Sequence, residues 1–269
     1  MDLGLENQLA IIVGGAHGIG LATAQMLLQE GVHIELWDFY GEGARVADEL
    51  QATSTQKVGF RQVDIVDEAA CRAAVDAARA AWPRLDHLVL TAAVGSRKFG
   101  FPFTKLQPQD WRRVIDVNIL GTANIAHAIG PVFIEQRSGT LTLLASVAGQ
   151  MGSQTDPPYS ASKAANINFM QCMAKDLAPY GVRVNAINPG MVQTDLNRSV
   201  WQAWYDGQPP DQRRSYEEWA GDKVRTVIPL GRWQTAEDIA AAITFLISPR
   251  ARNITGQAIN IDGGFVMHS

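Results

Sequence analysis

The sequence lacks the features that assign a chain to several special classes of protein. It has two cysteines in 269 residues, Cys71 and Cys172, both in predicted helices and without the spacing of a metal site. This usage predicts a reduced, cytoplasmic protein that holds no metal ion. Lysine and arginine form no runs and the net charge is −4, so nucleic acids and anionic membranes are poor partners. No apolar run reaches the length of a membrane span, about 18 residues, and the N-terminus, with Asp2 and Glu6, shows no signal peptide.

What the chain does contain is a regular alternation of apolar runs and helical patterns. This alternation predicts one α/β domain over residues 1–269, with a doubly wound, Rossmann-type sheet of seven parallel strands and helices on both faces. Ligands of such sheets bind beyond the carboxyl ends of the strands. The predicted strands are Leu9–Val13, His33–Trp37, Val58–Val63, Leu85–Thr91, Thr140–Ala145, Val182–Asn188 and Gln257–Ile261. The predicted helices are Leu21–Glu30, Asp67–Ala81, Pro108–Glu135 with interruptions near Gly121 and at Gly130-Pro131, the helix that starts at Pro157, and Ala236–Ile247.

The first strand leads into a glycine-rich loop, Gly14-Gly-Ala-His-Gly-Ile-Gly20, which a helix follows. Glycines let the backbone approach a pyrophosphate, and the start of the helix offers free N–H groups and a positive dipole end. The spacing is Gly-x-x-x-Gly-x-Gly, and its position between strand and helix predicts a site for a dinucleotide.

The second strand closes on Asp38. An acidic residue about 20 residues beyond the loop can accept hydrogen bonds from the adenosine ribose. A 2′-phosphate would be repelled by the same carboxylate, and His17 in the loop is mostly neutral at pH 7. Asp38 therefore predicts NAD as the cofactor.

Tyr159 and Lys163 stand four residues apart on a helix that Asp156 can cap and Gly181 can end. An ammonium about 4 Å from the phenol is worth about 4 kcal/mol at an effective dielectric near 20, which would lower the pKa of the tyrosine by about two or three units. Tyr159 would then accept protons near neutral pH. Alone, Tyr-x-x-x-Lys is a common surface pair, so the neighbouring motifs decide its meaning.

One region, about 194–226, interrupts the alternation with aromatic residues, two prolines and scattered charge. Its position between a strand and the last helix predicts a lid that folds over the site. For any single aromatic residue, a core or subunit contact is equally expected. The aromatic residues are Trp201, Trp204, Tyr205 and Trp219.

Five motifs in order resemble the short-chain dehydrogenase/reductase family over essentially the whole chain. They are the glycine loop, Val117-Asn118-Ile-Leu-Gly121, Ala145-Ser146-Val-Ala-Gly149 with Tyr159 thirteen residues after its serine, Asn188-Pro189-Gly190 with Thr194, and Asp262-Gly263-Gly264. The resemblance implies that Tyr159 exchanges the proton with the substrate oxygen and that Ser146 orients this oxygen. It also implies that Lys163 lowers the pKa of the tyrosine and holds the nicotinamide ribose, while Asn118 holds a water.

The resemblance also implies which residues contact the cofactor. They comprise the glycine loop, residues at the ends of four further strands, and the catalytic tyrosine and lysine. By number they are Gly14, His17, Gly18, Ile19, Gly20, Asp38, Asp64, Ile65, Ala92, Ala93, Tyr159, Lys163, Pro189, Gly190, Val192 and Thr194.

The chain departs from the family pattern at two places. Val13 stands where the family usually has threonine, and Leu90-Thr91-Ala92-Ala93 replaces Asn-Asn-Ala-Gly. The second change removes amides that brace the strand around the cofactor. We expect altered packing there and retained binding, because the backbone makes most of the contact.

These motifs predict an NAD-dependent short-chain dehydrogenase that transfers a hydride between the cofactor and a secondary alcohol or ketone. A polyol, sugar or cyclic alcohol is the expected small-molecule substrate, with Gln150, Gln154 and Arg97 as polar candidates beside it. The alternatives are a 3-oxoacyl thioester reductase and a non-catalytic dinucleotide-binding protein. The apolar helix that follows Pro157 and the resemblance together predict a homotetramer.

Overall fold

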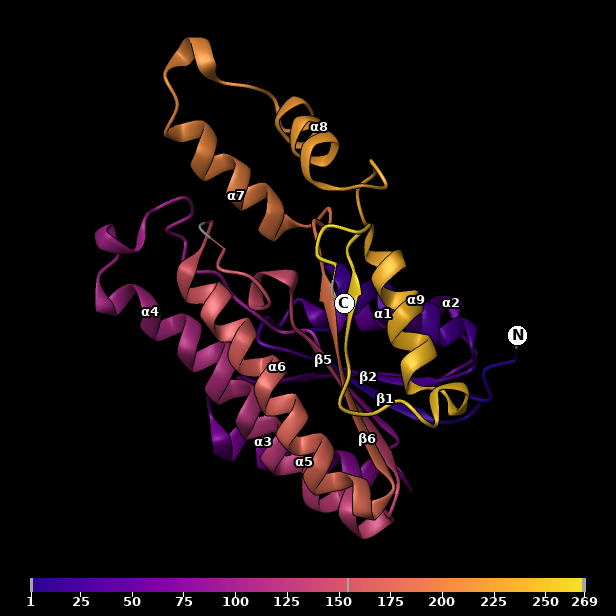
Figure 1. Ribbon diagram of the computed structural model, residues 1–269. Coiled ribbons are helices and arrows are strands. Elements are labelled where there is room, and N and C mark those ends of the chain that lie inside the picture. The colour runs from indigo at the N-terminus through magenta and orange to yellow at the C-terminus, as the bar shows by residue number, and fades with distance from the viewer. Residues whose placement is uncertain (1, 154, 268–269) are drawn as a thin grey trace.

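Seven parallel strands form one sheet in the order β3-β2-β1-β4-β5-β6-β7 (Figure 1). The computed structural model describes residues 2–153 and 155–267. The predicted doubly wound sheet is confirmed, and most predicted strands are correct to within two residues. The strands are β1 (Leu9–Val13), β2 (His33–Asp38), β3 (Val58–Gln62), β4 (His87–Leu90), β5 (Gly139–Leu144), β6 (Val182–Pro189) and β7 (Ala258–Ile261).

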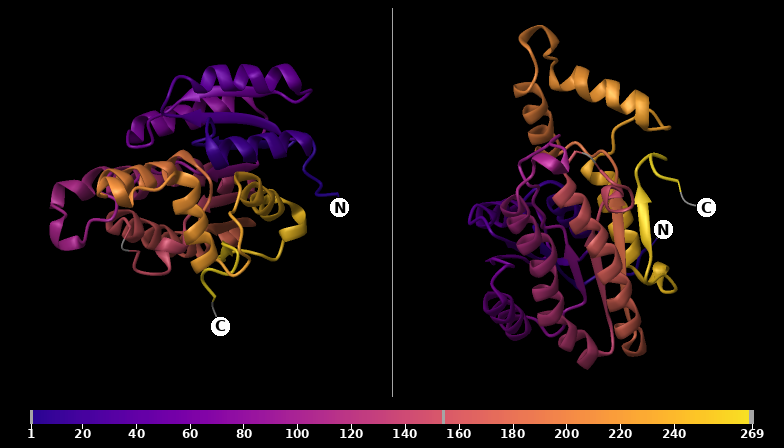
Figure 2. Two further views of the ribbon diagram at one scale, coloured as in Figure 1. Left: turned by 90° about the horizontal axis from the view of Figure 1, so that it is seen from above. Right: turned by 60° about the vertical axis from the view of Figure 1, so that its left-hand side comes forward.

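Helices cover both faces of the sheet (Figures 1 and 2). One layer consists of α1 (Gly18–Gln29), α2 (Gly43–Thr53) and α9 (Ala236–Ile247). The other contains α3 (Glu68–Ala81), α4 (Pro108–Ile115), α5 (Thr122–Gln136) and α6 (Pro157–Leu177). Short helical turns are η1 (Phe103–Lys105), η3 (Val147–Gly149), η4 (Ala178–Tyr180) and η6 (Pro249–Ala251). Helix α2 was not among the helices predicted from the sequence.

All five side chains of β1 are buried, and they alternate between the two layers. Leu9, Ile11 and Val13 belong to the core formed with α3, α5 and α6. Ala10 and Ile12 belong to the core formed with α1, α2 and α9. The continuous apolar run in the sequence is thus explained by a strand with helices on both sides.

A single helical stretch, Pro108–Gln136, comprises α4, a π-helical segment η2 (Asp116–Gly121) and α5. The interruption predicted near Gly121 corresponds to this π-helical segment. The interruption predicted at Gly130-Pro131 is wrong, because α5 continues through Pro131. Pro131 is exposed, so the carbonyl that loses its N–H partner can face water. The stretch is long and apolar enough to span a membrane, with a mean hydropathy of 1.4 in its most apolar window. It packs against α3 and α6 with 56% of that window buried, as a core helix does.

The region predicted as an irregular lid is helical. It consists of α7 (Asp195–Asp206), η5 (Pro210–Gln212) and α8 (Tyr216–Val227), which we call the arm. Thr194 caps α7, and Ser215 and Glu218 form a capping box on α8. The arm rises beyond the carboxyl ends of the strands (Figure 1). Its aromatic residues pack mainly on one another, in a cluster of Tyr216, Trp219 and Ala220 with Val200, Trp201, Trp204 and Trp233.

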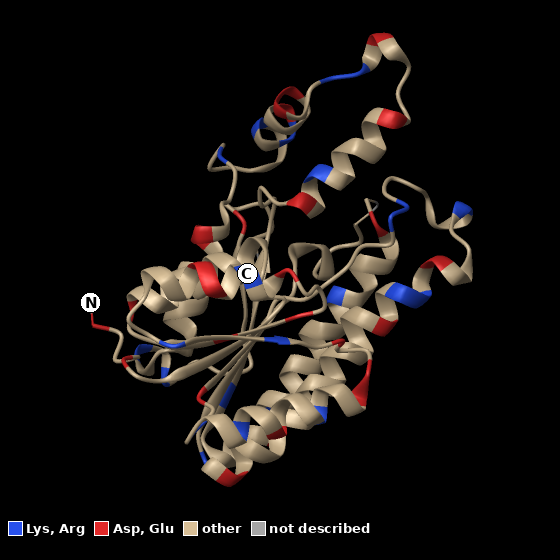
Figure 3. Cartoon of the chain, turned by 180° about the vertical axis from the view of Figure 1, so that it is seen from behind, with Lys and Arg blue, Asp and Glu red and all other residues tan. Residues whose placement is uncertain are grey.

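Charged side chains of both signs are spread over the helices and the arm (Figure 3). Neither sign covers one face of the molecule in this view. This distribution agrees with the net charge of −4.

Candidate active site

The loops that follow the strands meet beneath the arm and enclose a cavity of about 660 Å³. Its wall contains nearly all the site residues predicted from the sequence. Lys163 and Asn118 are buried behind the wall. The predicted residues that line the cavity are Gly14, His17, Gly18, Ile19, Gly20, Asp38, Asp64, Ile65, Ala92, Ala93, Ser146, Tyr159, Pro189, Gly190, Val192 and Thr194.

The glycine loop joins β1 to α1 at the floor of this cavity. Gly14 has φ +80°, and a Cβ atom there would lie 2.7 Å from the backbone nitrogen of Ala92, so only glycine fits. The side chain of His17 does not cap α1, and the first turn of that helix carries no acidic residue. The helix start therefore presents its N–H groups and positive dipole end to the cavity, which suits a pyrophosphate.

Thr91 braces the end of β4 in place of the side-chain amides that the family motif usually has there. Its Oγ1 lies 2.9 Å from the Val13 carbonyl oxygen and 3.0 Å from that of Gly14, and the hydroxyl donates to them. A hydroxyl thus ties β4 to the end of β1 where the family usually has an amide. Sequence reasoning missed this residue because its partners lie 77 and 78 positions away.

Asp38 ends β2 and is 7% exposed. One carboxylate oxygen accepts from the backbone N–H of Ala16 at 3.1 Å, and the other accepts from that of Tyr40 at 3.2 Å. These bonds fix the carboxylate at the cavity wall beside the glycine loop, and each oxygen retains a lone pair for a ligand hydroxyl. Phe39 and Tyr40 next to it are half exposed and also line the cavity.

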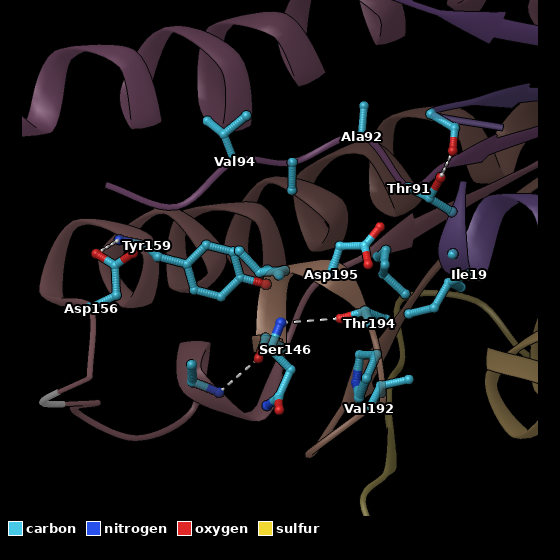
Figure 4. A pocket seen from close by; sticks show the side chains of 18 of the residues that line it. Ile19, Thr91, Ala92, Val94, Ser146, Asp156, Tyr159, Val192, Thr194 and Asp195 are labelled. Carbon is cyan, nitrogen blue, oxygen red and sulfur yellow. Dashed lines mark hydrogen bonds between the residues drawn. The ribbon is translucent and has the colours of Figure 1, made fainter. Parts of the chain in front are cut away.

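Tyr159 extends from the first turn of α6 into the cavity, towards Ser146 at the end of β5 (Figure 4). Asp156 fixes this turn, because its carboxylate accepts from the backbone N–H groups of Tyr159 at 3.4 Å and Ser96 at 2.9 Å. Burial raises the pKa of Tyr159 to about 12; its hydrogen bond with Ser146 lowers it and the charge of Asp156 raises it. The tyrosine is therefore protonated at neutral pH.

Lys163 lies one turn further along α6 and is 1% exposed. Its Nζ donates to the Leu144 carbonyl oxygen at 2.5 Å and lies 5.4 Å from the centre of the Tyr159 ring. Burial lowers the pKa of Lys163 to about 7. The pKa of Tyr159 is thus raised in this structure and not lowered as the sequence predicted, because burial outweighs the contributions that favour the phenolate.

Asn118 lies on the π-helical segment and is fully buried. Its Oδ1 accepts from the Val94 backbone N–H at 2.8 Å, and its Nδ2 donates to the Val94 carbonyl at 2.9 Å and to Ser162 Oγ at 3.0 Å. Both N–H groups of the amide are thus used by protein partners. Asn118 ties the loop after β4 to α6, the helix that carries Tyr159 and Lys163.

The segment after Ser146 is pressed against α6. A Cβ atom at Gly149 would lie 2.6 Å from the carbonyl carbon of Lys163, which explains the glycine in the motif. Ser160 Oγ donates to the Ala148 carbonyl at 2.5 Å, and Ser146 Oγ accepts from the Ala148 backbone N–H at 3.1 Å. These contacts fix the serine relative to the tyrosine.

The end of β6 and the C-terminal signature form one unit. A Cβ atom at Gly190 would lie 2.8 Å from Cβ of Asp262, so this glycine allows the close approach. The Asp262 carboxylate accepts from the backbone N–H groups of Gly264 at 2.9 Å and Val266 at 2.7 Å. This unit holds the segment from Pro189 to Thr194 at the cavity wall.

The arm supplies the remaining wall, which sequence reasoning had not resolved into residues. Gln150 and the exposed Arg97 are not part of the lining, and Gln154 lies outside the described residues. Of the predicted lid aromatics, Trp219 lines the cavity, whereas Trp201, Trp204 and Tyr205 do not. The arm residues of the wall are Asp195, Leu196, Asn197, Val200, Trp219, Lys223 and Val227, and residues outside the arm that also line it include Phe99, Arg113, Met151 and Phe265.

Comparison with known proteins agrees with this geometry. A family model described as enoyl-(acyl carrier protein) reductase matches residues 14–266. D-threitol dehydrogenase of Mycolicibacterium smegmatis is 33% identical over 267 residues, covering 99% of this chain and 95% of that protein. The 3-oxoacyl-(acyl-carrier-protein) reductase FabG of Chlamydia muridarum is 30% identical over 261 residues, with coverages of 97% and 98%. L-sorbose reductase from Gluconobacter frateurii, crystallised with NADPH and L-sorbose, is 25% identical with a TM-score of 0.90 over 100% of both chains.

Proposed function

The chain is an oxidoreductase of the short-chain dehydrogenase/reductase family, and on that premise we propose that it transfers a hydride between NAD(H) and a secondary alcohol or its ketone. The observation that carries this proposal is that Tyr159 and Ser146 lie together in the wall of a cavity that also contains the glycine loop and Asp38. A proton-transfer pair and a dinucleotide cradle share one space there. A protein that only binds dinucleotides needs no such pair.

The residues of the cavity fit a nicotinamide dinucleotide. The backbone at Gly14 leaves no room for a side chain, and the uncapped start of α1 suits the pyrophosphate. Asp38 would accept the ribose hydroxyls, Asp64 and Ile65 would flank the adenine, and the segment from Pro189 to Thr194 would hold the carboxamide. When bound, the nicotinamide supplies the hydride acceptor or donor.

In the reaction, Tyr159 exchanges a proton with the substrate oxygen, and Ser146 donates a hydrogen bond that positions this oxygen. Lys163 supports the tyrosine from behind the wall, where its ammonium favours the phenolate once the proton has left. Asn118 acts as a positioning residue through its bonds to Val94 and Ser162. Ketone reduction uses the protonated form that Tyr159 has at neutral pH, whereas alcohol oxidation requires the phenolate.

We propose NAD as the preferred cofactor. Asp38 would accept hydrogen bonds from the ribose, each worth about 1.5–3 kcal/mol with a charged acceptor. The 2′-phosphate of NADP would meet the same carboxylate, at a cost of about 4 kcal/mol for unit charges about 4 Å apart at an effective dielectric near 20. Even half of this repulsion, added to the lost hydrogen bonds, gives a preference of about a hundredfold.

We propose a polyol, sugar or cyclic alcohol as the substrate class. D-threitol dehydrogenase among the relatives and L-sorbose reductase among the related structures favour small polyhydroxylated substrates. The second candidate, a 3-oxoacyl thioester reductase, is favoured by the family model and by the FabG relatives. The net charge of −4 counts against a basic docking surface for an acidic carrier protein.

A direct assay separates these candidates. The purified protein is given NAD or NADP with a panel of polyols and cyclic alcohols, and NADH or NADPH with the ketones and a 3-oxoacyl thioester. Absorbance of the reduced nicotinamide reports turnover. Oxidation of polyols with NAD supports the proposal, a faster thioester reduction supports the second candidate, and cofactor binding without turnover of any substrate contradicts both.

We further propose that the protein is a cytoplasmic homotetramer. Ala161 and Ala164 are exposed on α6, whereas Ile167 and Phe169 pack partly on the protomer's own core. The exposed small side chains would let a second copy of α6 approach closely. Leu120, 50% exposed on the π-helical segment, extends the apolar surface available to that copy.

A further inference from the structure

Helix α8 brings a lysine into the wall of the cavity. Trp219, Lys223 and Val227 are four residues apart on this helix, so they share one face, and all three line the cavity. The ammonium of Lys223 lies 4.1 Å from the centre of the Trp219 ring. The charge of the lysine thus lies over the face of a buried aromatic residue in the wall of the cavity.

No carboxylate of the described residues lies within ion-pair distance of Lys223. The neighbouring acid on the helix, Asp222, pairs with both Arg214 and Arg225. Burial lowers the pKa of Lys223, so its ammonium has lost part of its hydration without gaining a counter-ion from the protein. A partly desolvated ammonium beside a cavity favours an anion there.

We propose that Lys223 binds an anionic group of the substrate, a carboxylate or a phosphate, so that the substrate is a charged polyhydroxylated alcohol or ketone. This inference rests on the proposed oxidoreductase function and specifies its substrate. Lys223 would fix the far end of the molecule while Tyr159 and Ser146 act on the carbinol. The apolar residues of the arm, Leu196, Val200 and Val227, would cover the carbon chain between them.

The test compares three substrates that share one carbon skeleton: sorbitol, gluconate and sorbitol 6-phosphate. With NAD at saturation and constant ionic strength, we expect one of the two anions to exceed sorbitol in kcat/KM by about 10- to 100-fold, the usual worth of a hydrogen bond to a charged group. Lys223→Met should remove this preference by raising KM for the anion about 10- to 100-fold and KM for sorbitol much less. Lys223→Arg should retain a preference for the anion.

Lys57 gives a matched control, because its ammonium also lies over a tryptophan, 5.7 Å from the centre of the Trp82 ring, but outside the cavity. Lys57→Met should behave as the wild type. A wild type that prefers sorbitol over both anions contradicts the inference. So does a Lys223→Met variant that loses activity equally on all three compounds, which would assign the lysine to packing on Trp219 alone.

Calorimetric titration in the presence of NAD separates this inference from the proposed function. If gluconate or sorbitol 6-phosphate binds to the wild type and not to Lys223→Met, but no compound is turned over, the anion site holds and the proposed reaction fails. If sorbitol is turned over and neither anion binds better than sorbitol, the reaction holds and the anion site fails. Binding of none of the three compounds contradicts the inference.

Discussion

The ammonium nitrogen of Lys163 lies 5.4 Å from the centre of the Tyr159 ring and donates its hydrogen bond to the Leu144 carbonyl. Both side chains belong to α6, and the lysine lies behind the wall in which the tyrosine is set. Burial therefore acts on the two groups in opposite directions: it raises the pKa of the phenol to about 12 and lowers that of the amine to about 7. Both shifts favour the neutral forms.

Replacement of the tyrosine hydroxyl should stop proton transfer without affecting the cofactor site. We expect Tyr159→Phe to lower kcat by about 10² to 10⁴, the usual worth of a positioned acid–base group. Titration with NAD, followed by calorimetry, should give an affinity close to that of the wild type. Near-normal turnover in the variant would show that the proton takes another route.

The pKa of about 12 for Tyr159 gives the two reaction directions different pH profiles. Ketone reduction needs the protonated phenol and should change little between about pH 6 and pH 9, whereas alcohol oxidation needs the phenolate and should rise up to about tenfold per pH unit. The measurement is kcat/KM in both directions across this range. An oxidation profile that levels off near pH 7 would restore the neutral pKa expected from the sequence.

Lys163 should oppose folding while it serves the reaction. Its pKa is about 7 in the folded protein and 10.5 in the reference state, so between these values the unfolded chain binds the extra proton and stability rises with pH. The full penalty is present below pH 7. We expect Lys163→Met to abolish activity yet to raise the free energy of unfolding at about pH 6 by about 1–3 kcal/mol. This gain is the removed burial penalty, about 1.4 kcal/mol for each unit by which the pKa is lowered, minus the contribution of the lost hydrogen bond to Leu144.

Denaturant unfolding at about pH 6 and about pH 10 checks this expectation. The stability difference between Lys163→Met and the wild type should shrink as the pH rises. A variant that is less stable than the wild type at both pH values would contradict the proposed burial penalty.

Substitution of Asp38 should reduce the preference for NAD over NADP. Asp38→Ser removes the negative charge but leaves a short hydroxyl beside the Ala16 N–H, so the repulsion of a 2′-phosphate disappears. We expect the ratio of kcat/KM for NAD to that for NADP to fall by at least about tenfold, since 1.4 kcal/mol is one factor of ten. Equal kcat/KM values with NAD and NADP in the wild type would contradict the assignment of Asp38 as the residue that selects NAD.

The exposed face of α6 should be sensitive to a large charged side chain. Ala164→Arg would place a guanidinium where two helices are proposed to approach, and we expect it to reduce the assembly to monomers or dimers in light scattering. Lys175→Ala, at an exposed position nearer the end of the same helix, serves as the control. A wild type that is monomeric at micromolar concentration removes the proposal of a tetramer.

The sequence predicted those parts of the molecule whose signals are local. The apolar run Leu9–Val13 predicts a buried strand, and the glycine spacing from Gly14 to Gly20 predicts a loop that can approach a phosphate. The sheet and the cofactor cradle follow from such local patterns. The pKa directions were not predictable in this way, because the burial of Lys163 depends on β5, α6 and the packed segment at Gly149. The four-residue spacing predicted that Tyr159 and Lys163 lie close together, but it could not predict how far burial desolvates them.

The helices of the arm were not predicted, for a different reason. Its prolines and scattered charges read as irregular, although Trp201, Trp204 and Tyr205 have the three- to four-residue spacing of a helix face. Thr91 was missed because its partners, Val13 and Gly14, are distant in the sequence. The helical spacing in the arm was therefore available in the sequence, whereas the role of Thr91 became visible only with its tertiary neighbours.

The arm has its own small aromatic core, Tyr216 and Trp219 with Trp201, Trp204 and Trp233, and it joins the rest of the chain through two short crossings near Val192 and Gln234, which pair as an isolated bridge. Tyr159, Ser146 and Lys163 all lie outside it. A segment that is stabilised internally and tethered at neighbouring points can be exchanged between homologous enzymes as a cassette. Grafting another dehydrogenase's arm between these two crossings would then transplant its substrate preference onto an unchanged catalytic apparatus.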